Sequence, residues 1–298
     1  MQDKNNNILE SLKAFLDRKG YSINRVARQL GYSPAVLSIY LQGKYSGNND
    51  KLEFAISSYL ARQEEIEQMP RESIPFVSIN NSKIVFSIAR MCHNECEIGC
   101  IVGEAGTGKT RAIKEYTLQN PDVILLEADL SYTTKIFFKE LSRKLGMDDS
   151  GGIYDLFTNC IDKLKDSGRL IIIDEAENLP YRALDMIRRL YDKANVGILL
   201  VGLPRLVSNL TGKRGEYKQL YSRVGFVSQL DRLTENDTRQ IVQKVFLSSN
   251  GEYADFHNLA KGNMRKLEKL ILRTKREIKS GKNLSPKLIK QASEMLIL

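Results

Sequence analysis

Residues 103–110 are Gly103-Glu104-Ala105-Gly106-Thr107-Gly108-Lys109-Thr110, a match to the phosphate-binding pattern G-x-x-x-x-G-K-[ST] at every required position. An apolar run at 97–102 precedes the stretch and is predicted to be a buried strand, and residues 111–116 are predicted to begin a helix. In this context the glycines let backbone N–H groups turn toward phosphate oxygens at a helix N-terminus. We expect all eight residues to bind a nucleotide, with Lys109 at the β- and γ-phosphates and the Thr110 hydroxyl on Mg²⁺.

A second stretch supports this interpretation. The apolar run at 169–173 ends in Asp174 and Glu175, which predicts a buried parallel strand with two carboxylates at its C-terminal edge, where ligands bind in open α/β sheets. Asp174 is expected to hold Mg²⁺ through water, and Glu175 is expected to orient and polarise the attacking water. Two acids after a strand can also lie at a surface without a function, but the phosphate loop upstream favours the catalytic interpretation.

Length and composition set the class of protein. The 298 residues are enough for a mid-sized domain and a small one. The N-terminus is polar, and the apolar runs are shorter than the roughly 20 residues of a membrane helix, so we expect a soluble, cytoplasmic protein without membrane contact. Cys92, Cys96 and Cys100 lie close together beside His93, but their spacing is unlike that of zinc pairs. Buried thiols are the preferred interpretation there, and a metal site is the alternative.

The positive charge is concentrated near the C-terminus. The formal net charge of the chain is +9, and residues 261–290 alone contain eleven lysines and arginines against two acidic residues, Glu268 and Glu277. A basic helical stretch without compensating acids is typical of segments that bind nucleic acid or another polyanion. A solvated helix face is the alternative, and charge alone does not separate the two.

The N-terminal region predicts a small helical domain. Ser22 can cap one helix, Gly31 suits a left-handed turn, and Ser33-Pro34 can begin the next helix. The unit at 22–41 resembles the repressor-type helix-turn-helix of the Cro/C1 family. That resemblance implies DNA binding through the N-terminal part of the second helix. The expected outward side chains are Ser33, Pro34, Ala35, Ser38 and Tyr40, with Arg28 and Lys44 near phosphates. These small side chains predict weak sequence preference, and a protein-binding bundle is the alternative.

Strands and helices alternate through the middle of the chain. Strands are predicted at 97–102, 123–129, 169–174, 196–202 and 226–229, and helices at 133–146, 153–166 and 180–193. This alternation predicts an α/β fold with a parallel sheet covered on both faces. The predicted domains are a helix-turn-helix domain at 1–62, a linker at 63–75, an α/β core at 76–230 and a basic helical lid at 231–298.

The core followed by a helical lid resembles the AAA+ ATPases. Tyr221-Ser222-Arg223-Val224 resembles the S-R element of initiator-type members, which implies that Arg223 reaches the γ-phosphate of a neighbouring subunit. Gly262-Asn263-Met264-Arg265 resembles the lid G-N-x-R element, which implies that Arg265 binds the nucleotide of its own subunit. Leu203 stands near the place of the usual polar sensor and cannot donate a hydrogen bond, so we expect slow hydrolysis.

The combination of "GEAGTGKT", "IIIDEAENL" and "YSRVG" with a repressor-like N-terminal domain and a basic C-terminal segment resembles the MuB family over nearly the whole chain. The resemblance implies ATP and Mg²⁺ as cofactors and ATP-dependent, largely sequence-nonspecific assembly on duplex DNA as a homo-oligomeric filament or ring. It also implies target capture, target immunity and activation of a partner transposase. Basic candidates for DNA contact in the core are Lys135, Arg182, Arg188, Arg189, Lys213 and Arg214. A helicase loader or replication initiator, and a nucleotide-switched DNA-binding regulator, are the alternatives.

Overall fold

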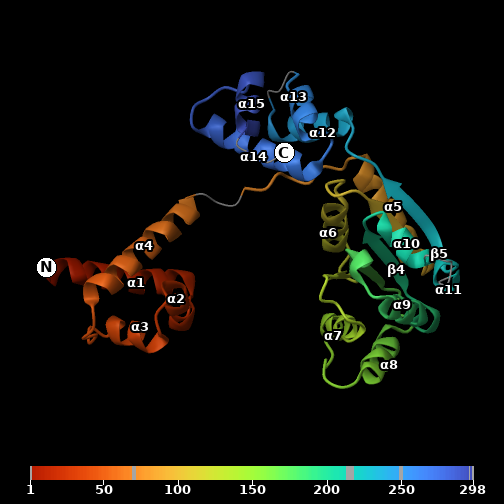
Figure 1. Ribbon diagram of the computed structural model, residues 1–298, viewed down its shortest axis with the longest axis horizontal. Coiled ribbons are helices and arrows are strands. Elements are labelled where there is room, and N and C mark those ends of the chain that lie inside the picture. The colour runs from red at the N-terminus through yellow and green to blue at the C-terminus, as the bar shows by residue number, and fades with distance from the viewer. Residues whose placement is uncertain (1, 69–71, 213–217, 248–250, 295, 297–298) are drawn as a thin grey trace. The chain divides into compact units, whose positions relative to one another are not determined.

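The structure is a computed structural model that describes the chain except residues 1, 69–71, 213–217, 248–250, 295 and 297–298 (Figure 1). The chain divides into two compact units, Met1–Glu72 and Ser73–Leu298, which are described separately. Within the described ranges, each helix is either too short or too polar to span a lipid bilayer.

The first unit is a bundle of four helices. They are α1 (Gln2–Lys19), α2 (Ile23–Leu30), α3 (Pro34–Leu41) and α4 (Asn49–Gln68). The Ser22 and Ser33 side chains cap α2 and α3 by accepting hydrogen bonds from backbone N–H groups three residues on. Gly31 ends α2 with a φ of 76°, a conformation that glycine adopts without strain. The helix-turn-helix geometry is therefore built by local sequence. Because α4 runs to Gln68, the first part of the predicted linker at 63–75 is helical.

The core of this unit corrects one prediction. Tyr40 was expected to face outward, but it is 4% exposed and its hydroxyl donates a 3.3 Å hydrogen bond to the buried Glu53 carboxylate. Burial raises the pKa of Tyr40 above its ordinary value. Leu37 and Tyr40 are three residues apart and so share the buried face of α3. Ile39 is the exposed residue beside them.

The second unit is built on a five-stranded parallel sheet, which confirms the predicted α/β class. Its strands lie in the order β2-β3-β4-β1-β5. Their bounds are β1 (Ile98–Gly103), β2 (Ile124–Glu127), β3 (Leu170–Asp174), β4 (Gly197–Gly202) and β5 (Val224–Leu230). The register pairs Ile98 with Ile198 and Ile173 with Leu200. The predicted strands at these places are each found, with ends that differ by at most two residues.

Helices cover both faces of the sheet (Figure 1). One face packs against α5 (Asn80–Glu95) and α6 (Lys109–Gln119). The other face packs against α7 (Thr134–Lys144), α8 (Ile153–Leu164), α9 (Tyr181–Ala194) and α10 (Arg205–Thr211). Three short elements were not predicted: α10, the 3-10 helix η1 (Ala176–Asn178) and α11 (Lys218–Tyr221).

The C-terminal region is helical, as predicted. It contains α12 (Glu235–Val245), α13 (Tyr253–Ala260), α14 (Met264–Lys279) and α15 (Pro286–Glu294). A capping box between Thr234 and Asp237 begins α12. Ile74 and Ile79, from the segment before α5, are buried in the same apolar cluster as these helices. The lid is therefore packed against the chain that enters the α/β core.

Candidate functional site

The phosphate loop connects β1 to α6. Gly106 and Gly108 have φ values of 88° and 94°, so side chains at these two positions would be strained. Lys109 is 8% exposed, and its ammonium donates to the carbonyl oxygens of Gly103 at 2.6 Å and Glu104 at 3.0 Å. Burial lowers the pKa of Lys109. The loop thus places a poorly hydrated cation at its centre, where an anionic phosphate would compensate it.

Two acids follow β3 at the same edge of the sheet. Asp174 is 2% exposed; its Oδ1 accepts from the Glu175 N–H at 3.0 Å, and its buried Oδ2 finds no hydrogen-bond partner in the described part of the chain. Burial raises the pKa of Asp174, and the Thr110 hydroxyl acts in the opposite direction. A hydroxyl and an unsatisfied carboxylate oxygen are ligands that suit Mg²⁺, so these residues fit that ion.

Glu175 has an unusual backbone conformation for a non-glycine residue, with a φ of 52°. Burial and the neighbouring Asp174 carboxylate raise the pKa of Glu175. The Asn178 amide donates a 3.3 Å hydrogen bond to its Oε2. The Glu175 carboxylate is therefore held by a polar neighbour at the edge of the phosphate loop.

These groups line one cavity of about 750 Å³, within the range typical of small-molecule sites. The cavity is lined by residues 105, 106 and 108–110 of the phosphate loop, by both acids, and by residues that follow β4 and begin α14. The side chains that matter for the argument are Lys109, Thr110, Asp174, Glu175, Leu203, Arg205 and Arg265. The structure thus brings the predicted phosphate, metal and lid residues together, and it also places Leu203 beside them.

The lid touches the phosphate loop directly, through contacts that sequence reasoning did not predict. The Met264 N–H donates to the Gly106 carbonyl at 2.7 Å, and the Asn263 amide donates to the Ala105 carbonyl at 2.9 Å. Arg111, just after the loop, forms a 3.1 Å ion pair with Glu268 of α14. These contacts hold Arg265 at the mouth of the cavity. The G-N-x-R spacing could have indicated the Asn263 contact, because the element was already assigned to the lid.

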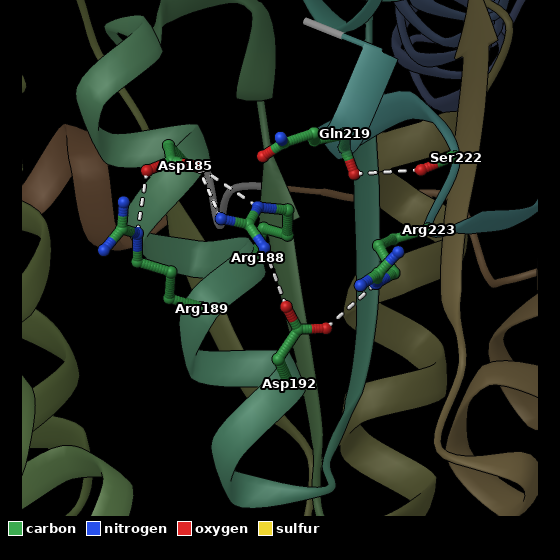
Figure 2. Close-up of polar contacts among 7 residues, drawn as sticks. All are labelled: Asp185, Arg188, Arg189, Asp192, Gln219, Ser222 and Arg223. Atoms are coloured by element: carbon green, nitrogen blue, oxygen red, sulfur yellow. Dashed lines mark hydrogen bonds and ion pairs between the residues drawn. The ribbon is translucent and has the colours of Figure 1, made fainter.

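Arg223 occupies a different surface (Figure 2). Its Nε donates to Asp192 of α9 at 3.0 Å, and the described residues that line the cavity do not include it. Asp192 also accepts from Arg188 at 2.7 Å, and Arg188 and Arg189 both donate to Asp185 at 2.9 Å. Burial raises the pKa of Asp185, but hydrogen bonds from the two arginines outweigh it and leave the pKa below its ordinary value. Arg223 is therefore presented from an ordered network of charges.

Comparison with known proteins shows what these features are similar to. Residues 92–210 match the AAA domain family. The chain is 27% identical to the "Mu-like prophage FluMu DNA transposition protein B" of Haemophilus influenzae, over 82% of this chain and 87% of that protein. It is 25% identical to the "ATP-dependent target DNA activator B" of Escherichia phage Mu, over 78% of this chain and 76% of that protein. The chain is thus similar to MuB proteins over most of its length, and it is called MuB-like below in that sense; its residues 92–210 match the AAA domain family.

A solved structure supports the fold. The ORC2 protein of Aeropyrum pernix in its ADP form is similar with a TM-score of 0.60 and 16% identity, over 77% of this chain and 72% of that chain. At this identity the similarity concerns the fold alone. The AAA domain identifies the MuB-like chain as a phosphate-loop nucleotide triphosphatase.

The predicted DNA-binding residues of this MuB-like chain lie in varied surroundings. Of the residues predicted in the first unit, Arg28, Ser33, Ala35 and Lys44 are exposed and Ser38 is half-buried. In the second unit, Lys135, Arg182 and Arg189 are exposed, whereas Lys213 and Arg214 lie outside the described residues. The Arg188 side chain is 12% exposed and is already engaged by two carboxylates.

The cysteines of the MuB-like chain are free thiols. Cys92 and Cys100 are buried, and burial raises the pKa of each to about 12. Among the described residues, no three or more His, Cys, Asp or Glu side chains lie together in a group that could hold a metal ion.

Proposed function

We propose that this MuB-like chain is an ATPase that assembles on duplex DNA in its ATP-bound form, captures target DNA and activates a partner transposase. The observation that carries the proposal is the single cavity that joins the buried Lys109, the two acids Asp174 and Glu175, and the lid residue Arg265. The names of the phage and prophage relatives, a target DNA activator and a DNA transposition protein, support the DNA-directed part.

The chemistry in the cavity follows from the groups that line it. The phosphate loop and Lys109 bind the β- and γ-phosphates, and Arg265 binds the nucleotide from the lid. Thr110 and Asp174 would hold Mg²⁺, which would neutralise phosphate charge when bound. The Glu175 carboxylate orients and polarises the water that attacks the terminal phosphate. Leu203 at the end of β4 makes hydrolysis slow, because its side chain cannot donate to phosphate or water.

Assembly links nucleotide to DNA. Arg223 is 46% exposed and separate from the cavity of its own subunit, so it is available to the cavity of a neighbour. An ATP molecule that contacts two subunits binds the assembled state more tightly than it binds a single subunit, so ATP favours assembly. Each subunit makes weak contacts with DNA phosphates, and many assembled subunits together bind DNA strongly and in a salt-sensitive manner. In this proposal the helix-turn-helix domain at 1–62 and the basic helical lid at 231–298 contribute DNA contacts, and the protein acts in the cytoplasm.

The test is binding to random-sequence duplex DNA with ATP, with ADP and without nucleotide, followed by electron microscopy. We expect ATP-dependent, length-dependent coating of any duplex. Lys109→Ala should abolish it, whereas Lys163→Ala, which removes an exposed lysine on α8, should not. A footprint at one defined sequence that is unaffected by Lys109→Ala would instead make the chain a DNA-binding regulator. Addition of a transposase to the coated DNA should stimulate both strand transfer and ATP hydrolysis.

A further inference from the structure

Leu203 occupies the place of the usual polar sensor residue after β4, but a polar side chain, Arg205, lies nearby. Leu203 lines the cavity, and two residues later Arg205 begins α10 and lines the same cavity. The Arg205 Nη2 donates to the Asn178 side-chain oxygen at 3.1 Å and lies 3.9 Å from Glu177 Oε1. The Arg205 side chain is 59% exposed, so these contacts leave most of the guanidinium open. A guanidinium has five N–H donors, and only one nitrogen is used here.

Packing fixes the start of α10 against η1. The Asn209 amide, one turn along α10, donates to the Glu177 carbonyl at 3.0 Å, and Leu206 and Leu210 are buried in the core. Gly202 lies so close to Glu177 that an added Cβ would be 2.2 Å from its Oε2. Glu177 is 4% exposed on its side chain, and its Oε2 finds no hydrogen-bond partner among the described residues. A buried carboxylate that is not fully paired favours a cation at the position of Arg205.

Asn178 connects this arginine to the catalytic carboxylate. Its side-chain oxygen accepts from Arg205, and its amide nitrogen donates to Glu175 Oε2 at 3.3 Å and to the Ala128 carbonyl at 3.2 Å. The backbone of η1 adds a turn that spans Glu175 and Asn178, because the Asn178 N–H donates to the Glu175 carbonyl at 3.0 Å. One side chain thus contacts both groups at the edge of the cavity.

We propose that Arg205 binds the terminal phosphate of the nucleotide in its own subunit, in the place that Leu203 cannot fill, and that Asn178 positions Glu175 beside it. This inference rests on the proposed function of the cavity. Arginine suits the role because its planar fork matches phosphate oxygens and stays charged at any physiological pH. Arg205 is separate from Arg223, which is held on another surface and is assigned to the neighbouring subunit.

The first test compares nucleotides with and without the third phosphate. Affinities for ATPγS and ADP are measured by competition with a fluorescent ADP analogue, for the full chain and for Arg205→Ala and Arg205→Lys. Arg205→Ala should weaken ATPγS binding about tenfold or more and leave ADP binding within about twofold, because the lost hydrogen bonds are to a charged group. Arg205→Lys should recover part of the difference. Arg143→Ala, which removes an exposed arginine of α7 whose partner is Asp149, is the matched control.

If Arg205→Ala loses affinity equally for ATPγS and ADP, or loses affinity for neither, the proposed role of Arg205 is wrong. This failure is distinct from failure of the proposed function. If wild-type protein does not bind DNA in response to ATP, the function fails. If it does, and Arg205→Ala still binds ATPγS as tightly as wild type, only the present inference fails.

The second test separates the two contacts of Asn178. Asn178→Asp keeps an oxygen for Arg205 and removes the donor to Glu175, so kcat should fall about tenfold or more while KM and ATPγS affinity change by less than about twofold. Asn178→Gln retains the amide and should recover part of kcat. A variant Asn178→Asp with wild-type kcat would exclude the positioning role. So would a KM that rises in step with the fall in kcat. If the aspartate variant does not fold, Asn178→Ala also removes the donor to Glu175 without adding a charge, and its kcat should fall in the same way.

Discussion

Two charged regions of the α/β core are built in opposite ways. In the cavity, Lys109 contacts only oxygens of its own loop, and Asp174 Oδ2 has no partner among the residues described. On α9 and at the start of β5, Arg188 lies between Asp185 and Asp192, and Asp192 also holds Arg223 (Figure 2). The first region leaves buried charges that attract each other but form no direct ion pair among the described residues, and the second pairs its charges directly.

The pKa shifts follow this difference. Burial lowers the pKa of Lys109 and raises that of Asp174, so each group is disfavoured in its charged form. At Asp185 burial acts in the same direction as at Asp174, but the arginines prevail and lower the pKa. Buried charges without direct partners lower the stability of the fold but are available to bind a ligand. Side chains that are paired with one another, by contrast, hold each other in fixed positions. We therefore interpret the cavity as a binding site and the network as the surface that holds Arg223 when no neighbouring subunit is bound.

The largest effect should come from the cavity. Glu175→Gln keeps the size of the side chain and removes the base, so kcat should fall about 100-fold or more while ATP binding is retained. Because hydrolysis is the proposed release step, this variant should stay on DNA after ATP is diluted. Single-turnover hydrolysis and a dissociation time course measure the two effects. Departure from DNA as fast as wild type would separate release from hydrolysis.

Substitution of Arg223 should affect hydrolysis in the neighbouring subunit rather than in its own. Arg223→Ala should lower DNA-stimulated hydrolysis about tenfold or more and leave nucleotide affinity unchanged, because the arginine acts in another subunit. Mixing Arg223→Ala with Glu175→Gln should restore activity at about one interface in four, since some interfaces combine an intact cavity with an intact arginine. A mixture no more active than its components would place Arg223 in its own subunit and weaken the comparison.

The sequence predicted those features that depend on neighbours along the chain. The phosphate loop, the acids after β3 and the capped helices α2 and α3 are each specified by a few consecutive residues, and each lies where it was expected. Tyr40 was placed wrongly because α3 is short and apolar on several sides, so periodicity alone did not identify its buried face. The engagement of Arg188 could have been predicted, since Asp185 and Asp192 stand three residues before it and four residues after it.

Other contacts depend on packing and carry no local signal. The Arg223 and Asp192 pair joins residues 31 positions apart, and the Arg205 and Asn178 pair joins residues 27 apart. The first requires β5 to pass beside α9, and the second requires α10 to lie on η1. Neither α10 nor η1 was predicted, because each is shorter than the windows over which helical periodicity is measured. The sequence therefore indicated that the phosphate loop, the two acids, Leu203 and Arg265 lie together, but it did not indicate that Arg205 and Asn178 complete the wall of the cavity.

Replacement of an aspartate by asparagine should have a smaller effect, on thermal stability, and the effect should have opposite signs in the two regions. The folded pKa of Asp174 is raised, so the ligand-free protein loses stability as pH rises through that pKa, and Asp174→Asn should remove the loss. We expect Tm to rise at neutral pH. Asp185→Asn should lower Tm instead, since the lowered pKa of Asp185 stabilises the fold above the pKa of the unfolded chain. Thermal unfolding without nucleotide measures both, and a shift of the same sign in both variants would contradict the comparison.

The smallest effect concerns the contact that holds Arg223. The side chains of Arg223 and Asp192 are 46% and 29% exposed, and an ion pair with that exposure contributes about 0.2–1 kcal/mol. Asp192→Asn should therefore free Arg223 at little energetic cost and raise DNA-stimulated hydrolysis by about twofold to fivefold. Asp185→Asn leaves the Asp192 contact intact and should not raise it. If Asp192→Asn instead loses as much activity as Arg223→Ala, the carboxylate orients the arginine for its neighbour, and the network is part of the catalytic arrangement.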